Sequence, residues 1–107
     1  MQQLYPPDLR AWLDDATRAA PVILDVREGW ELERCSLPGT TWIPLREVPA
    51  RMEELNPNAD IVVVCHHGVR SLHIARLLEH EGFSRVYNLA TGVDGWARQV
   101  DPSMPIY

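Results

Sequence analysis

The residues best able to do chemistry in this sequence stand together in one short run, residues 65–71, CHHGVRS. Its cysteine is the strongest nucleophile in the chain, and cysteine reacts as the thiolate. A free thiol has a pKa of about 8.5, but a helix N-terminus or neighbouring cations lower thiol pKa values to roughly 3.5–7.5. Arg70 carries a permanent positive charge, and His66 and His67 add charge when they are protonated. The run therefore predicts a nucleophilic cysteine in a loop that favours an anion.

The segments on either side place this run between a strand and a helix. Residues 61–64, IVVV, are apolar on both faces, as in a central parallel strand, and residues 71–83 have the apolar spacing of a helix. A loop that closes onto a helix N-terminus turns backbone N–H groups inward, and the helix dipole adds roughly half a positive charge there. Glycine in the run permits a backbone conformation that strains other residues. We expect Cys65 to be catalytic and six residues to bind the substrate: His66, His67, Gly68, Val69, Arg70 and Ser71. Two alternatives stay open: Arg70 as a residue that only braces the loop, and the histidines as solvated loop residues.

Strand-like and helix-like segments alternate along the rest of the chain. Further strands are expected at residues 22–26, 40–45 and 85–89, and helices at residues 8–18 (capped by Asp8), 28–35, 46–55 and 92–100. This alternation predicts an α/β domain with a mostly parallel sheet, in which ligands bind beyond the carboxyl ends of the strands. Asp25 and Arg27 end a strand next to the cysteine strand, so we expect them to support the site as an ion pair at the same rim.

Composition narrows the classes of function. A chain of 107 residues fits one domain, 1–107, and a net charge of −5 argues against nucleic acid as a partner, because phosphate binding needs a basic surface. Two cysteines cannot form a secreted disulfide framework. No signal peptide is visible, and no stretch approaches the ~18 apolar residues of a membrane span. We therefore expect a cytoplasmic protein with no membrane partner.

The loop C-x-x-G-x-R-S after a VVVC strand resembles the active-site loop of the rhodanese-like sulfurtransferases. Other segments resemble that family in the same order, over almost the whole chain: LDVRE at 24–28, Trp30-Glu31, LPGT at 37–40, IPL at 43–45, GF at 82–83, VYNL at 86–89 and Gly92 to Trp96. The chain departs from the family pattern at Ser36, where a histidine is common, and at Thr91, where the family has a glycine. Neither departure lies in the cysteine loop.

The resemblance implies a rhodanese-like three-layer α/β/α fold with a five-stranded, mostly parallel sheet. It also implies a sulfurtransferase that moves a sulfane sulfur from a donor such as thiosulfate to a thiophilic acceptor, cyanide or a thiol, through a Cys65 persulfide. Neither a metal nor an organic cofactor is expected. The expected partners are a small-molecule donor and acceptor, and a protein sulfur acceptor stays open. Because His66-His67 is less basic than the Arg-Lys pair of some thiosulfate-using members, thiosulfate is the weaker part of this expectation.

Two other classes of function stay open. A cysteine phosphatase or arsenate reductase on the same fold uses a C-x5-R loop that cradles a tetrahedral anion, whereas Cys65 to Arg70 is C-x4-R, one residue shorter. A non-enzymatic sulfur-carrier or binding module is the other alternative. Zinc binding by Cys65, His66 and His67 is disfavoured, because adjacent ligands have no matching second pair. Cys35 lies in a turn with no helix N-terminus beside it, and we expect no role for it.

Overall fold

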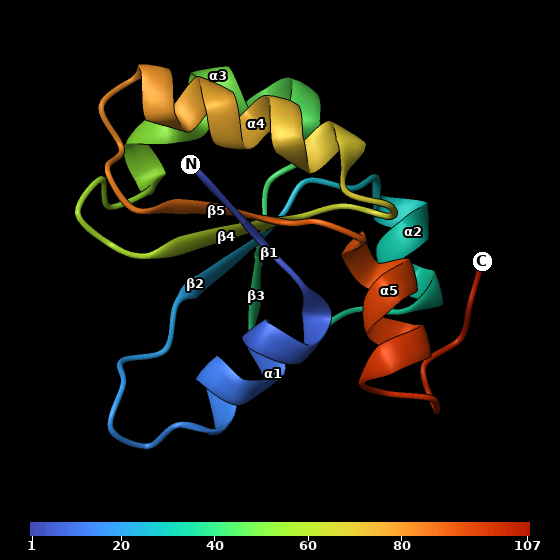
Figure 1. The fold of residues 1–107 in the computed structure, drawn as a ribbon. Helices are drawn as coiled ribbons and strands as arrows, with labels where there is room; N and C mark the ends of the chain where they lie inside the picture. Colours follow the sequence, from blue (N-terminus) through green and yellow to red (C-terminus); the bar gives the residue numbers. More distant parts are fainter.

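The computed structural model describes residues 1–107, and its centre is a sheet of five strands in the order β1-β5-β4-β2-β3 (Figure 1). Every neighbouring pair in the sheet is parallel, which confirms the predicted α/β class. The strands are β1 (Gln2–Leu4), β2 (Val22–Asp25), β3 (Thr40–Trp42), β4 (Ile61–Val64) and β5 (Val86–Leu89).

Strand β4 lies at the middle of the sheet and is buried on both faces, as its IVVV sequence predicts. Successive side chains of a strand point to opposite faces, so Ile61 and Val63 enter one apolar core and Val62 and Val64 enter the other. The first core packs against the layer of α3 (Val48–Arg51) and α4 (Val69–His80), and the second against α1 (Pro6–Asp14) and α5 (Gly92–Gln99) (Figure 1). The result is the expected arrangement of three layers.

The remaining helical segments differ in detail from the prediction. A short helix, α2 (Gly29–Arg34), follows β2 as expected. The helix predicted over 46–55 is instead three short pieces: 3-10 turns at Leu45–Glu47 and Met52–Glu54 on either side of α3. Pro49 is one cause, because proline has no backbone N–H to donate to a preceding turn.

The start of α1 corrects a second expectation. Tyr5, and not Asp8, occupies the N-cap, and two prolines fill the first turn, where a missing N–H costs nothing. Asp8 is the third residue of the helix, within its first turn, and its carboxylate accepts a hydrogen bond from the Tyr5 backbone N–H at 3.3 Å. The aspartate therefore stabilises this helix start from within the helix.

Strand β1 is absent from the sequence-based set of strands. It is an edge strand of three residues, QQL, with two exposed polar side chains, and it pairs only with β5. So short and polar a segment has no periodic signal of its own, and it becomes a strand because β5 offers it a free edge.

The register of the sheet decides where the chemistry can occur. Asp25 at the end of β2 lies beside Val64 at the end of β4, and the Val26 N–H donates to the Val64 carbonyl at 3.0 Å. The chain after β2 and the cysteine loop after β4 therefore leave the sheet side by side at its carboxyl edge. None of the helices has both the length and the apolar character that crossing a bilayer requires.

Candidate active site at the Cys65 loop

The sulfur of Cys65 lies at the centre of the loop between β4 and α4 and is surrounded by hydrogen-bonding groups. The backbone N–H groups of Gly68 and Ser71 donate to Sγ at 3.1 and 3.3 Å, and the Ser71 hydroxyl lies 3.2 Å from it. The residue itself is only 1% exposed. The structure thus places inward-facing amides around residue 65, as the loop position at a helix N-terminus predicts. Such a cradle suits one anionic sulfur atom.

The direction of the Ser71 hydrogen bonds follows from Asn88 on β5. The Asn88 amide nitrogen donates to the Gly68 carbonyl at 3.1 Å, which fixes the orientation of the amide and turns its oxygen toward Ser71. The single hydroxyl proton of Ser71 is donated to that oxygen. In this arrangement the Ser71 oxygen accepts from the thiol of Cys65. A thiolate at Cys65 would favour rotation of the same hydroxyl toward sulfur.

Two glycines let the loop approach neighbouring backbone closely. Gly68 has a φ of +99°, and a Cβ atom there would lie 2.1 Å from the Ala90 carbonyl oxygen. Gly92, at the start of α5, has a φ of +63°, and its Cβ would lie 2.4 Å from the Cys65 carbonyl oxygen. Because these spaces hold no side chain, the N–H groups of Val93 and Asp94 reach the carbonyls of Cys65 and His66 at 2.9 and 3.1 Å. The first turn of α5 therefore anchors the start of the cysteine loop.

Arg70 does not present a free charge to a substrate. Its two terminal nitrogens each donate to a different oxygen of Glu31 on α2, both at 2.8 Å. Glu31 is only 3% exposed; burial would raise its pKa, but the hydrogen bonds and charge of Arg70, with the Glu28 backbone N–H, lower it to about 2. The same hydrogen bonds raise the pKa of Arg70 above its ordinary value. Arg70 thus fastens the loop to α2.

Asp25 and Arg27 form a second ion pair under the same rim. Their side chains are fully buried, and the Arg27 guanidinium donates to the Asp25 carboxylate at 2.7 Å. Arg27 also donates to the Cys35 carbonyl at 2.8 Å, which ties the end of α2 to the end of β2. The ion pair thereby holds α2, which carries Glu31, against the end of β2. Because Asp25 compensates its charge, Arg27 acts as a positioning residue and offers no free charge to a substrate.

The histidines lie in a stack of rings. The ring of His66 lies 3.9 Å from that of His67 and 3.9 Å from that of Tyr107, between centroids. Burial and the neighbouring His67 lower the pKa of His66 below its ordinary value, which disfavours the protonated form that would add positive charge to the loop. His67 and Val69 are exposed at the outer side of the loop.

A metal centre is poorly matched to this stack. His66, His67 and Asp94 offer ligand atoms within 4.8 Å of one another, whereas Cys65 is not part of the group. The imidazole lone pairs lie in the ring planes, and these planes are only 31° apart and face each other, so the lone pairs do not converge on one point. Asp94 is also engaged by Arg98 at 2.9 Å.

Three polar residues of this network were missed as site residues by sequence reasoning: Glu31, Asn88 and Tyr107. Asn88 is a polar residue in an otherwise apolar strand, and this is the one signal that single-sequence reasoning could have used. Glu31 was noted only as part of a family-like pair, without its partner Arg70. Nothing local marks Tyr107, which is 76 residues from Glu31 in the chain.

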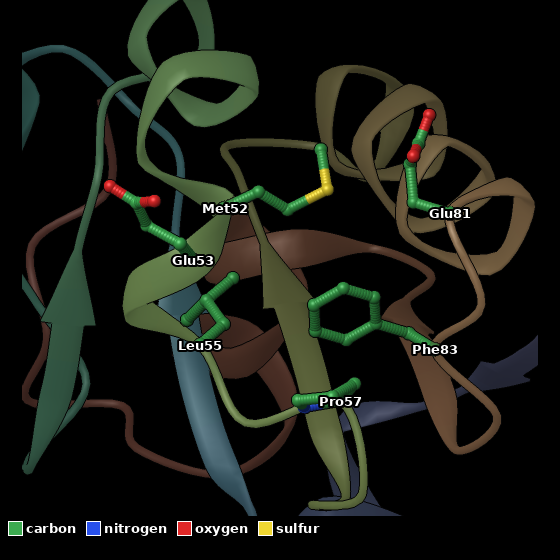
Figure 2. A pocket seen from close by; sticks show the side chains of 6 residues that line it. All are labelled: Met52, Glu53, Leu55, Pro57, Glu81 and Phe83. Atoms are coloured by element: carbon green, nitrogen blue, oxygen red, sulfur yellow. The ribbon is translucent and has the colours of Figure 1, made fainter.

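A shallow hollow elsewhere on the molecule has no share in this chemistry. Figure 2 shows its lining: Met52, Glu53, Leu55, Pro57, Glu81 and Phe83. It lies beside the carboxyl end of α4, whereas Cys65 lies at the amino end of that helix, which spans Val69–His80.

The comparison with family models decides the classification. The model of the rhodanese-like domain matches residues 6–99, which include every strand except β1 and the whole cysteine loop. The chain belongs to the rhodanese-like domain family.

Individual relatives support this membership. A sulfurtransferase of Allochromatium vinosum is 32% identical over 77 residues, 72% of either chain. A Bacillus subtilis protein whose name suggests a sulfur carrier is 43% identical over 79 residues, but this chain spans only 43% of its length. Among solved structures, a rhodanese-like domain protein from Staphylococcus aureus superposes with a TM-score of 0.85 at 26% identity, covering 100% of this chain and 99% of its own. The implied rhodanese fold is therefore confirmed, with a sheet that is wholly parallel.

We expect Gly68→Ala to disable the loop of this rhodanese-like domain, and Gly82→Ala to be the matched control. Both glycines have nearly the same φ, +99° and +95°, but only at Gly68 would the new Cβ meet another group. The left-handed conformation alone costs roughly 1–2 kcal/mol in either variant. Gly68→Ala should lose more unfolding free energy than Gly82→Ala in urea denaturation and should lose reactivity at Cys65. Equal losses in the two variants would contradict the close-approach argument.

The Glu31–Arg70 pair predicts a pH dependence of stability. The pKa of Glu31 falls from 4.5 to about 2 on folding, so the stabilisation is fully present above about pH 4.5 and is lost as the pH falls toward 2. The unfolding free energy of Glu31→Gln should therefore change less between pH 5 and 2 than that of the unaltered protein. The difference between the two changes should be no more than about 3 kcal/mol. Urea denaturation at a series of pH values measures this, with the exposed Glu53→Gln as the control. An unchanged profile in Glu31→Gln would show that Arg70 does not hold the carboxylate.

Proposed function

We propose that this rhodanese-like domain transfers a sulfane sulfur, with Cys65 carrying it as a persulfide. The observation that carries the proposal is the cradle at Cys65, in which the amides of Gly68 and Ser71 donate to one sulfur atom at 3.1 and 3.3 Å. Hydrogen-bond donors that stabilise a thiolate also stabilise the terminal anion of a persulfide. The relatives named sulfurtransferases at 30–38% identity support the same chemistry.

With thiosulfate as the donor, the reaction takes two displacements. The Cys65 thiolate attacks the outer sulfur of thiosulfate, a new S–S bond forms, and the S–S bond of thiosulfate breaks as sulfite leaves with the electron pair. A nucleophilic acceptor, cyanide or a thiolate, then attacks the outer sulfur of the persulfide and releases the Cys65 thiolate. No net oxidation occurs in the cycle, so no redox cofactor is needed. The thiol proton leaves to solvent before the first step.

The loop length and the paired arginine disfavour the phosphatase alternative. Cys65 to Arg70 is C-x4-R, and Arg70 spends both of its terminal nitrogens on Glu31. A phosphate would need that guanidinium for its own oxygens. A solved protein described as a possible tyrosine phosphatase is similar at 20% identity, a likeness that concerns the fold alone.

A protein acceptor is the second form of this proposal. The relative from Bacillus subtilis whose name suggests a sulfur carrier matches 74% of this chain. In such a role the Cys65 persulfide would be delivered to a thiol on a partner protein, and the chemistry at Cys65 would be unchanged.

Incubation with thiosulfate should add one sulfur atom to Cys65. Intact-mass measurement followed by peptide mapping detects the adduct, and cyanide should remove it with release of thiocyanate. Cys65→Ser should abolish both reactions, whereas Cys35→Ser should retain them, because the amides of Gly68 and Ser71 donate to the sulfur of Cys65 and not to that of Cys35. Hydrolysis of p-nitrophenyl phosphate should be absent. An unmodified Cys65 across thiosulfate, a glutathione persulfide and polysulfide would overturn the proposal.

Ser71→Ala should slow persulfide formation and leave the fold intact. The hydroxyl is one of three groups close to Sγ, and its removal takes away the donor that can rotate toward the attacking thiolate. A hydrogen bond to a charged group contributes about 1.5–3 kcal/mol, so its loss should lower the amount of reactive thiolate, and with it the rate at neutral pH, by roughly 10- to 100-fold. Ser71→Thr keeps the hydroxyl and is the conservative control. Stopped-flow measurement of the first displacement tests this, and equal rates for Ser71→Ala and the unaltered protein would refute the role of the hydroxyl.

A further inference from the structure

The segment after α5 turns back toward the cysteine site. Figure 1 shows it running alongside α5 toward α2. We call residues 101–107 the strap. The Asp101 N–H donates to the Trp96 carbonyl at 2.9 Å, and the Met104 N–H donates to the Asp101 carbonyl at 3.0 Å. Met104 is buried in the core between the sheet and the α1–α5 layer. The strap is therefore held in place by packing and by hydrogen bonds.

Tyr107 on the strap contacts the start of the cysteine loop and is linked through Glu31 to its end. Its ring stacks on His66, the residue directly after Cys65, with ring centroids 3.9 Å apart and planes 5° from parallel. Its hydroxyl donates to Glu31 at 3.1 Å, and Glu31 in turn holds Arg70. The same hydroxyl accepts from Arg27 at 2.8 Å. The Tyr107 side chain thus links three parts of the site: His66 at the start of the loop, the Glu31–Arg70 pair at its end, and the buried Arg27.

The phenol is suited to this position because it stays neutral. Burial raises the pKa of Tyr107 to about 12, against the opposing effect of Arg27 and with the help of Glu31. The proton therefore remains available for the Glu31 carboxylate throughout the neutral range. Phenylalanine could keep the stacking on His66 but could not link Arg27 to Glu31.

Tyr107 covers the residue next to a cysteine that is closed off from solvent. Cys65 is 1% exposed although the proposed reaction needs two reagents to reach its sulfur. The family model ends at residue 99, so the strap lies outside the part of the chain that the model describes. Trp30 of α2 meets the Tyr107 ring edge-on, with centroids 6.0 Å apart.

We propose that Tyr107 is a specificity-determining residue, which closes the strap over the Cys65 loop and so selects donors and acceptors by size. This rests on the proposed function, since selection matters only if sulfur passes through Cys65. With the strap in place, small reagents reach the sulfur more readily than bulky ones. A bulky donor or a protein acceptor must displace the Tyr107 ring from His66 before it reacts.

Alkylation with two maleimides of the same chemistry and different size tests this in the full chain. Rates for N-methylmaleimide and N-(1-pyrenyl)maleimide at Cys65 are measured by peptide mass spectrometry, with Cys35 in the same molecule as the internal reference. A closed site opens in roughly 0.1–10% of molecules, so Tyr107→Ala should raise the pyrenyl rate by about tenfold or more. The methyl rate should rise much less. Tyr107→Phe keeps the stacked ring, and its pyrenyl rate should lie between those of the unaltered protein and Tyr107→Ala.

Ile106→Ala is the matched control, because Ile106 is exposed on the same strap and makes none of these contacts. It should leave both rates within about twofold of those of the unaltered protein, as expected when an exposed side chain outside the contacts of Tyr107 is shortened. Unchanged rates in Tyr107→Ala, or an equal rise for both maleimides, would overturn the proposal. Thermal melting shows whether Tyr107→Ala is folded. If it is not, Tyr107→Phe provides the test, and an unchanged pyrenyl rate in Tyr107→Phe would then overturn the proposal. Alkylation needs no sulfur donor, so its outcome is separate from that of the thiosulfate experiment.

Discussion

Two backbone amides and one hydroxyl surround the sulfur of Cys65, and much of the polar structure at this edge of the sheet holds them there. Asn88 on β5 orients the Ser71 hydroxyl, because its side-chain oxygen accepts a hydrogen bond from that hydroxyl. Its side-chain nitrogen donates to the Gly68 carbonyl. The first turn of α5 fixes the other end of the loop through the carbonyl of Cys65. Each contact comes from a different element of the fold. The cradle is therefore a property of the packed sheet and its helices, and the isolated loop would not keep it.

The charged residues around the cradle are paired with one another. Asp25 compensates Arg27, and Glu31 compensates Arg70, with little solvent access to either carboxylate. A buried charge without a partner is strongly destabilising, so pairing at this depth is expected. The consequence for chemistry is that the charged groups do not contact the sulfur, whereas the amides of Gly68 and Ser71 donate to it directly, at 3.1 and 3.3 Å. The arginines contribute by fixing geometry, and a highly charged donor finds little uncompensated positive charge at the loop.

Most of the fold could be predicted from local patterns. The IVVV run indicates a strand buried on both faces, and β4 is that strand. The edge strand β1 was not predicted, because three polar or half-buried residues carry no periodic signal and pair only where a neighbour is exposed. The helix predicted over 46–55 is broken around Pro49, because proline lacks the backbone N–H that a continuous helix needs there. For the site, the loop residues could be predicted as a group, but the charge state of His66 could not, since burial under Tyr107 and contact with His67 decide it.

The sequence by itself determined which residue is the candidate nucleophile, its place between a central strand and a helix, and the family to which the chain belongs. These follow from short-range features: apolar runs, a glycine at a turn, and a nucleophile beside an arginine. Only the tertiary structure decided that this arginine pairs with Glu31 and that Tyr107 stacks on His66, the residue after the cysteine. Glu31 is 39 residues from Arg70, and Tyr107 is 76 residues from Glu31. Contacts across such separations arise only when separate elements pack together, and no local pattern in a single sequence encodes them.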